Sequence, residues 1–138
     1  MLIIGGGPAG RALAIEFARL SRSVTIVDAN PNQPWNSTYG TWVDDLDNRD
    51  DAAELQSCFQ RTWPQVRVVG KVEHHLSRPY GIFDNNLLQK YLTDDAVKFC
   101  EGVVVRVQHS DENILQVQLS SNERYEARAV FDLSLIHI

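Results

Sequence analysis

The sequence predicts an α/β fold, and three observations support this. A glycine-rich segment at residues 5–10 separates a short apolar strand from a helix. An acidic residue, Asp28, ends the next predicted strand. After residue 102 the hydrophobic residues change from helical spacing to alternation, which is typical of antiparallel strands.

Composition is that of an ordinary folded domain. The chain has 138 residues, of which 43% are hydrophobic and 22% charged. Its net charge of −5 argues against nucleic-acid binding, which depends on an excess of Lys and Arg. No apolar run is long enough to span a bilayer, and no secretory signal precedes Leu2, so secretion is not expected. Cys58 and Cys100 fit no metal or redox spacing, and no metal site is expected.

The first elements predict a βαβ unit. Leu2–Ile4 is an apolar run that stops at glycine, as a strand truncated at its start would. Pro8–Leu20 is predicted to be a helix, since proline suits a first turn. Its apolar residues at helical spacing are Ala12, Ile15, Ala18 and Leu20. Ser23–Asp28 is rich in β-branched residues and is predicted to be the second strand.

The middle of the chain is less regular. Residues 29–49 are rich in Pro, Asn, Asp and Trp, and this composition indicates a long loop. Asp50–Gln60 is compatible with a helix and Val66–Val72 with a short strand. Asp84 is typical of a helix N-cap. The apolar stripe that follows it consists of Leu87, Leu88, Tyr91 and Leu92.

The last third predicts strands only. Val97–Phe99 is expected to be a third parallel strand. Two alternating segments follow, with turn signals at residues 110–113 and 120–123, and together they predict a β-meander. Their alternating residues are Val103, Val105 and Val107, then Leu115, Val117 and Leu119. Ala127–Asp132 is predicted to return as an apolar strand.

The segment Gly-Gly-Gly-Pro-Ala-Gly at residues 5–10 matches the pattern G-x-G-x-x-G. Each glycine has a physical task in this motif. Gly5 makes the tight turn after the strand, and Gly7 lets the backbone approach a pyrophosphate. Gly10 lets the helix pack closely on the sheet. The motif is informative here because it lies between a predicted strand and a predicted helix.

The helix start and Asp28 complete the motif. Pro8 and Ala9 open the helix, whose backbone N–H groups and positive end would bind phosphates. Asp28 follows Gly10 by 18 residues and is placed to accept hydrogen bonds from ribose hydroxyls. These features predict a Rossmann-like FAD/NAD(P)-binding domain and do not distinguish FAD from NAD. The β-meander favours FAD, by analogy with the glutathione-reductase-like fold, which carries such an insertion.

Three stretches resemble one family. Residues 34–46, which read P-W-N-S-T-Y-G-T-W-V-D-D-L, are similar to a segment of plant and cyanobacterial lycopene cyclases with the pattern W-P-N-x-Y-G-x-W-V-D-E. Residues 62–64 and 78–88 resemble two further stretches of that family, in the same order. The resemblance covers about residues 2–132. In the family's pattern proline stands where this chain has Asn36.

The resemblance also implies how the chain is organised. Residues 1–132 would form the N-terminal part of an FAD-binding domain, truncated relative to the family. Residues 133–138 stand where that fold normally has an Asp-Ala-x-Gly turn touching the cofactor, so they are interpreted as a non-native tail. The acid that drives the family's reaction is expected outside this chain. No residue here is therefore named as catalytic, and the fragment alone is expected to be inactive.

The function that the resemblance implies is FAD-dependent cyclisation of lycopene to carotenes with β-rings. A carboxylic acid protonates the terminal double bond, the neighbouring double bond attacks the resulting carbocation, and loss of a proton completes the ring. Reduced FAD would stabilise the cation, with NAD(P)H as the reductant. The C40 hydrocarbon substrate implies peripheral membrane contact of the full protein. That contact would be on the cytoplasmic side of a membrane or at a plastid or thylakoid membrane.

Several side chains have both a functional and an ordinary interpretation. Arg78 corresponds to an arginine near the cofactor in related flavoprotein folds, or is a surface arginine. The aromatic residues of the 34–46 segment could line a flavin or a cation path, or simply pack the loop. Asp44 and Asp45 are candidates for acid–base work, or charges at a helix entry.

Two other classes of protein remain open. An FAD-dependent monooxygenase or isoprenoid reductase would share the glycine motif and Asp28, but would not need the stretch at residues 39–44. A non-catalytic nucleotide-binding module would require the 138 residues to be a complete protein.

Overall fold

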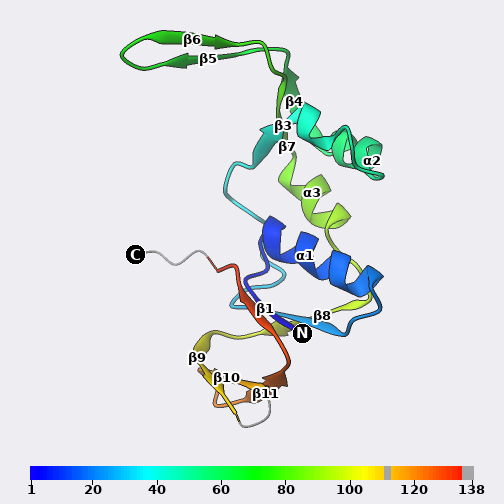
Figure 1. The fold of residues 1–138 in the computed structure, drawn as a ribbon, viewed down its shortest axis with the longest axis vertical. Helices are drawn as coiled ribbons and strands as arrows, with labels where there is room; N and C mark the ends of the chain where they lie inside the picture. The colour runs from blue at the N-terminus through cyan, green and yellow to red at the C-terminus, as the bar shows by residue number, and fades with distance from the viewer. Residues whose placement is uncertain (111–112, 135–138) are drawn as a thin grey trace. The chain divides into compact units, whose positions relative to one another are not determined.

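A computed structural model describes residues 1–110 and 113–134 (Figure 1). The chain divides into two compact units. The first comprises residues 1–33 and 92–138, and the second comprises residues 34–91. The fold is of the mixed α/β type, with strands and helices in both halves of the sequence.

A four-stranded parallel sheet forms the centre of the first unit. Its strands lie in the order β12 (Val130–Asp132), β1 (Leu2–Ile4), β2 (Val24–Asp28) and β8 (Val97–Glu101). The predicted strands near residues 2, 24 and 97 are confirmed, and the third is parallel to β2 as expected. The returning strand pairs with β1 but begins at Val130, because Ala127 belongs to the preceding strand.

The chain beyond β12 includes the predicted tail. The Leu133 N–H donates a hydrogen bond to the Ile4 carbonyl at 2.8 Å, so residue 133 still runs beside β1. Residues 135–138, which make up most of the predicted tail, lie outside the described residues.

Helix α1 (Pro8–Arg19) packs against β1, β2 and β8. The predicted helix is confirmed, but the predicted apolar stripe is wrong at two positions. Ala12 is exposed, and the Leu20 side chain, just beyond the helix, is 68% exposed. The face turned to the sheet instead consists of Gly10, Arg11, Ala14 and Ile15. Gly10 lies on this buried face, where the helix comes close to the end of β1.

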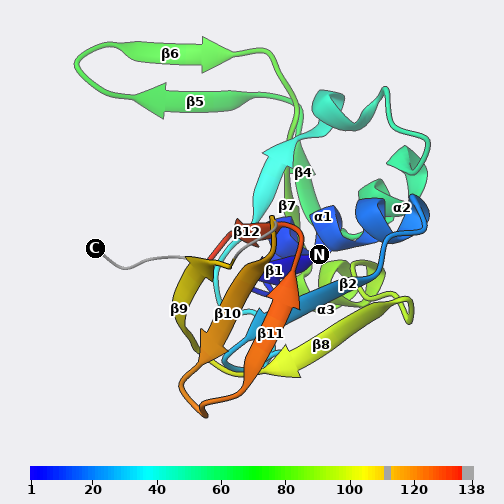
Figure 2. The same ribbon diagram turned by 60° about the horizontal axis from the view of Figure 1, so that its bottom comes forward.

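The predicted β-meander is confirmed as an antiparallel three-stranded sheet (Figure 2). Its strands are β9 (Val104–His109), β10 (Leu115–Leu119) and β11 (Arg124–Ala127). The alternating valines at 103, 105 and 107 are exposed, so the core residues of the meander come mainly from β10. The predicted turn at residues 110–113 includes residues 111–112, which lie outside the described residues.

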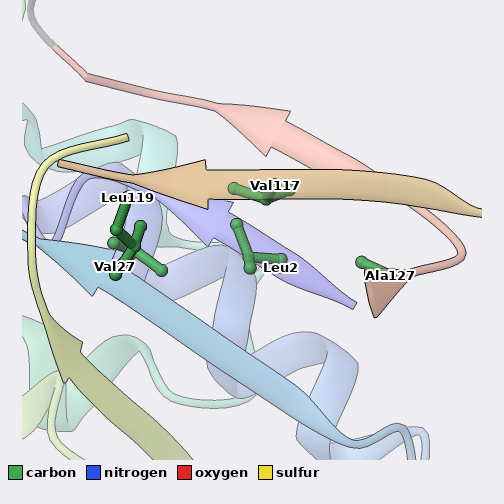
Figure 3. Close-up of a cluster of buried hydrophobic side chains, with 5 residues drawn as sticks. All are labelled: Leu2, Val27, Val117, Leu119 and Ala127. Atoms are coloured by element: carbon green, nitrogen blue, oxygen red, sulfur yellow. The ribbon is translucent and has the colours of Figure 1, made fainter. Parts of the chain in front are cut away.

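A buried cluster joins the meander to the parallel sheet (Figure 3). Leu2 and Val27 point from the parallel sheet toward Val117 and Leu119, and Ala127 completes the cluster. Val117 and Leu119 are fully buried. Each of these large apolar side chains contributes roughly 1.5–3 kcal/mol through burial, which holds the two sheets of the first unit together.

The second unit contains two small antiparallel sheets and three short helical segments. The three-stranded sheet has the order β3 (Gly40–Trp42), β7 (Tyr80–Phe83) and β4 (Phe59–Trp63). The hairpin consists of β5 (Val66–Val69) and β6 (Glu73–Leu76). The helical segments are a 3₁₀ turn (Val43–Leu46), α2 (Ala52–Ser57) and α3 (Asn85–Tyr91).

Two predictions for this unit are wrong in extent. Residues 29–49 are not a continuous loop, because they contain β3 and the 3₁₀ turn. The helix predicted at 50–60 ends at Ser57, because Phe59 enters β4 and stacks on Phe83 with ring centroids 4.5 Å apart. Both errors have one cause: pairing with β7 overrides local propensity. The Asp84 N-cap is confirmed, since its Oδ1 accepts the N–H groups of Asn86 and Leu87 at 2.8 and 3.1 Å.

Asp51 provides a test of stability against pH in this unit. Arg49 donates two hydrogen bonds to its carboxylate at 2.7 and 2.9 Å, and the Tyr91 hydroxyl donates a third at 2.6 Å. The bonds from Arg49, followed by the bond from Tyr91, hold the pKa of Asp51 well below its ordinary value. A depressed carboxyl pKa contributes stability above the unfolded value near 4, and this contribution is lost as pH falls below it.

We therefore expect Asp51→Asn to lower the free energy of unfolding by about 1 kcal/mol at pH 7, because solvent screens the pair. The difference from wild type should shrink as pH falls from about 4 to about 2. Urea unfolding midpoints across this range measure it, with Glu54→Gln on the same helix as the control. A difference that stays constant with pH would contradict the assignment.

Candidate functional site

The glycine-rich segment between β1 and α1 depends on one positive φ angle and one close backbone contact. Gly5 has φ +102°, a conformation that side-chain-bearing residues rarely adopt. A Cβ on Gly10 would lie 2.0 Å from the Gly5 carbonyl oxygen, so only glycine allows α1 to approach β1 this closely. The expected tasks of Gly5 in the turn and of Gly10 in helix packing agree with this geometry.

Gly7 differs from Gly5 and Gly10, because the packing of the protein does not require a glycine at this position. A Cβ built on Gly7 would meet no atom within 4 Å in the described part of the chain. Gly7 is the N-cap of α1, no described side chain caps the helix, and its first turn carries no acid. Pro8 and Ala9 open the helix as expected, with Ala9 exposed. The open space over Gly7 and the adjoining N–H groups suit an anionic ligand.

Asp28 lies beside this segment, but it already has backbone partners. Its Oδ2 accepts the Gly6 N–H at 2.7 Å, and its Oδ1 accepts the Asn30 N–H at 2.8 Å. A carboxylate offers about four acceptor positions, so further capacity remains for hydroxyl donors. Asp28 therefore supports the shape of the glycine segment, a contribution that sequence reasoning did not include.

Arg11 is a residue that sequence reasoning missed. It is only 5% exposed, and its guanidinium donates to the Gly6 carbonyl at 2.9 Å and the Pro31 carbonyl at 2.6 Å. Burial lowers the pKa of Arg11, and the charge of Asp28 partly opposes this. The available signal was its position: Arg11 precedes Ala14 and Ile15 on one face of the helix.

Arg78 lies in the second unit and is paired with acids. Its Nε donates to both carboxylate oxygens of Asp44 at 2.7 and 2.8 Å, and a terminal nitrogen donates to Asp45. The guanidinium lies 4.9 Å from the ring centroid of Trp42. The hydrogen bond from Arg78 holds the pKa of Asp44 below its ordinary value. Asp44 and Asp45 occupy the first turn of the 3₁₀ segment, so the helix-entry interpretation describes their position.

The aromatic residues of the 34–46 segment form edge-to-face pairs within the second unit. Trp35 packs against Tyr39 at 5.6 Å between ring centroids, and Trp42 against Tyr80 at 5.1 Å. The second unit also contains a cavity of about 400 Å³. It is lined by Val43, Gln56, Phe59, Thr62, Trp63, Pro64 and Pro79. A role for these aromatic residues beside a flavin stays a prediction.

The cysteines and the acidic and histidine side chains of the described residues form no second candidate site. Cys58 and Cys100 are free thiols, the first buried and the second partly buried. Within residues 1–110 and 113–134 no group of three or more His, Cys, Asp or Glu side chains is arranged to hold a metal ion. None of the described helices is both long and apolar enough to cross a membrane.

Comparison with known families decides the family. The model of the family described as "Lycopene cyclase protein" matches residues 1–136, almost the whole chain. The chain belongs to the lycopene cyclase protein family. The resemblance seen in residues 34–46, 62–64 and 78–88 is thereby confirmed.

Curated relatives agree with this assignment. The chloroplastic lycopene beta cyclase of Arabidopsis thaliana is 35% identical over 139 residues, which is 96% of this chain and 26% of that protein. An uncharacterized carotenoid cyclase of Deinococcus radiodurans is 32% identical over 97% of this chain and 32% of its own length. This lycopene cyclase family chain thus spans about a quarter to a third of the relatives it matches.

Solved structures share the fold. PqsL of Pseudomonas aeruginosa, described as "a probable FAD-dependent monooxygenase", matches 94% of this chain and 40% of its own with a TM-score of 0.67. Its sequence identity is only 18%, so this likeness supports the fold and carries no argument about reaction.

Proposed function

We propose that the full-length protein cyclises lycopene to carotenes with β-rings. The observation that carries this proposal is the family match over residues 1–136. Relatives named lycopene beta cyclase, 30–35% identical, support it. Because this chain covers only part of those relatives, the acid that protonates the substrate is assigned to the sequence outside it. The fragment alone is then expected to be inactive.

We further propose that residues 1–132 are the N-terminal part of an FAD-binding domain of the Rossmann-like, glutathione-reductase-like type. Support comes from the parallel sheet, the meander and the glycine segment in one unit. The fit of the cofactor rests on Gly7, where a side chain would occupy open space and meet no protein atom. Gly5, Gly7, Pro8, Ala9 and Gly10 would hold the pyrophosphate, and Asp28 the ribose.

In this proposal the described residues bind and orient FAD. The chemistry is supplied by the cofactor and by the acid assigned to the sequence outside this chain. When bound, reduced FAD supplies an electron-rich group that stabilises positive charge, with NAD(P)H as its source of electrons. The N–H groups at the start of α1 would neutralise phosphate charge, and Asp28 would hold the ribose of the adenosine half. Arg78 remains a proposed cofactor residue, although Asp44 and Asp45 already engage its guanidinium.

Location follows from the substrate. A C40 hydrocarbon resides in a lipid phase, so we propose peripheral contact of the full protein with a membrane. Relatives from Arabidopsis and Capsicum are described as chloroplastic or chromoplastic, which supports a plastid or thylakoid membrane or an equivalent cytoplasmic membrane surface. No nucleic-acid partner is proposed, consistent with the net charge of −5.

The test of the proposed function is expression of the full-length protein in cells that accumulate lycopene. We expect red lycopene to be converted to yellow-orange cyclic carotene, with no stoichiometric consumption of NAD(P)H. Chromatography of extracted pigments and NAD(P)H oxidation by the purified protein measure the two parts. Oxygen incorporation, or one NAD(P)H oxidised per product, would move the protein to the monooxygenase or reductase class. Cyclisation by the 138-residue chain alone would place the acid within it.

Asp28 offers a quantitative test of the cofactor site. A hydrogen bond to a charged group contributes about 1.5–3 kcal/mol, so Asp28→Ala should weaken FAD binding by roughly 10- to 150-fold. Asp28→Asn keeps one carboxamide oxygen for a backbone N–H, and a smaller loss is expected. Titration of the apoprotein with FAD measures both variants. An unchanged dissociation constant for Asp28→Ala would show that neither a ribose contact of Asp28 nor its support of the glycine segment contributes to FAD binding.

A further inference from the structure

Arg11 occupies an unusual environment for a charged residue. Among the described residues it is the only charged side chain that is buried, with 5% of its surface exposed. Burial of a charge is costly unless hydrogen bonds compensate it. Three hydrogen bonds and an aromatic ring compensate the buried charge of Arg11, and the identity of these partners indicates its role.

The guanidinium connects three segments that are distant in sequence. Nε donates to the Gly6 carbonyl at 2.9 Å, and the terminal nitrogens donate to the Pro31 carbonyl at 2.6 Å and to Thr93 Oγ1 at 2.8 Å. The Phe99 ring of β8 lies 4.7 Å from the guanidinium carbon. These contacts tie the glycine segment to the chain after β2 and to the chain before β8. All of these residues belong to the first unit.

Both peptide groups that flank the Cα atom of Gly6 are fixed by a hydrogen bond to a side chain. Its N–H, in the peptide joining residues 5 and 6, donates to Asp28 at 2.7 Å. Its carbonyl, in the peptide joining residues 6 and 7, accepts from Arg11 at 2.9 Å. In a planar trans peptide the carbonyl and the next N–H point in opposite directions. Because Arg11 holds the Gly6 carbonyl inward, the Gly7 N–H is directed away from Arg11.

We propose that Arg11 is a positioning residue for dinucleotide binding: it fixes the Gly6–Gly7 peptide so that the Gly7 N–H is presented to the pyrophosphate. This inference rests on the proposed FAD site. Arg11 acts through Gly6, because one hydrogen bond from each of its three nitrogens is directed to Gly6, Pro31 and Thr93. A lysine cannot replace it, because three acceptors in different directions match the planar fork of a guanidinium and not a single ammonium.

The experiment uses the full-length protein with Arg11→Ala and Arg11→Lys. Arg19→Ala is the matched control, because Arg19 lies on the same helix but is exposed and pairs with Glu16 at 2.9 Å. FAD dissociation constants are measured for each variant, with and without low millimolar methylguanidinium. Circular dichroism and thermal unfolding of each apoprotein establish that it is folded.

We expect Arg11→Ala and Arg11→Lys to weaken FAD binding by about 10- to 100-fold, equivalent to about 1.4–2.8 kcal/mol. Methylguanidinium should enter the space left in Arg11→Ala and restore about fivefold or more, equivalent to about 1 kcal/mol. It should not help Arg11→Lys, and Arg19→Ala should bind FAD like wild type. Recovery by the missing functional group separates positioning from general loss of stability.

Wild-type affinity in Arg11→Lys would overturn the inference, as would a loss in Arg11→Ala that methylguanidinium does not reverse. If Arg11→Ala fails to fold, Arg11→Lys alone decides. A second readout needs no cofactor: hydrogen exchange over residues 5–10 in the apoprotein should be faster in Arg11→Lys than in wild type or Arg19→Ala. Failure of wild type to bind FAD would instead refute the proposed function, while the exchange data would still test loop positioning.

Discussion

Gly7→Val should abolish detectable FAD binding while the full-length protein stays folded. The side chain would project into space that no described protein atom occupies, so its clash would be with the ligand. Overpacking costs about 1–3 kcal/mol, and the lost phosphate contacts add to this, so affinity should fall by at least about 100-fold. Flavin absorbance of the purified variant and titration of the apoprotein measure the effect.

Stability should change little in the same variant. Gly7 has φ −72° and ψ −179°, an extended conformation that valine adopts readily, and the poorer N-cap should cost about 1 kcal/mol or less. Gly70→Val is the control, because a Cβ there would approach only the Val72 carbonyl oxygen, at 3.9 Å. That control should retain FAD. A Gly7→Val protein purified with its full complement of flavin would refute the proposed phosphate site.

Gly10→Ala should have the opposite profile and destabilise the fold itself. Its Cβ would lie 2.0 Å from the Gly5 carbonyl oxygen. The Cβ is fixed to the backbone of α1 and the oxygen is a backbone atom, so the clash is relieved only if α1 moves away from β1. We expect a loss of about 3 kcal/mol or more in the free energy of unfolding, the upper range for overpacking. Urea unfolding midpoints of the apoprotein measure it.

The direction of the change in the free energy of unfolding makes this test decisive. At an uncrowded helix position, Gly→Ala stabilises by up to about 1 kcal/mol through helix propensity. Gly7→Ala, where nothing is crowded, serves as the control and should stay within about 1 kcal/mol of wild type. Stability equal to or above wild type in Gly10→Ala would mean that α1 does not approach β1 as closely as the structure shows.

Elements with strong local signals could be predicted from sequence. The βαβ start, the Asp84 cap and the meander each rest on residues close together in the chain, so pattern and structure agree. The sheet β3-β7-β4 was not predicted, because β7 joins segments near residues 40 and 60 that carry no signal of each other. Burial also departed from pattern in the meander, where Val105 alternates correctly but is exposed.

The glycine motif, the acid that ends β2 and the family resemblance were determined by the sequence alone, because each is a matter of residue type at fixed local spacing. The hydrogen bond from the Gly6 N–H to Asp28 and the whole environment of Arg11 were decided only by the tertiary structure. Arg11 reaches Thr93, which is 82 positions away, and such a contact exists only after β8 has paired beside β2. Hydrogen bonds between distant segments depend on where the folded backbone places each acceptor, and no local pattern of side chains records that position.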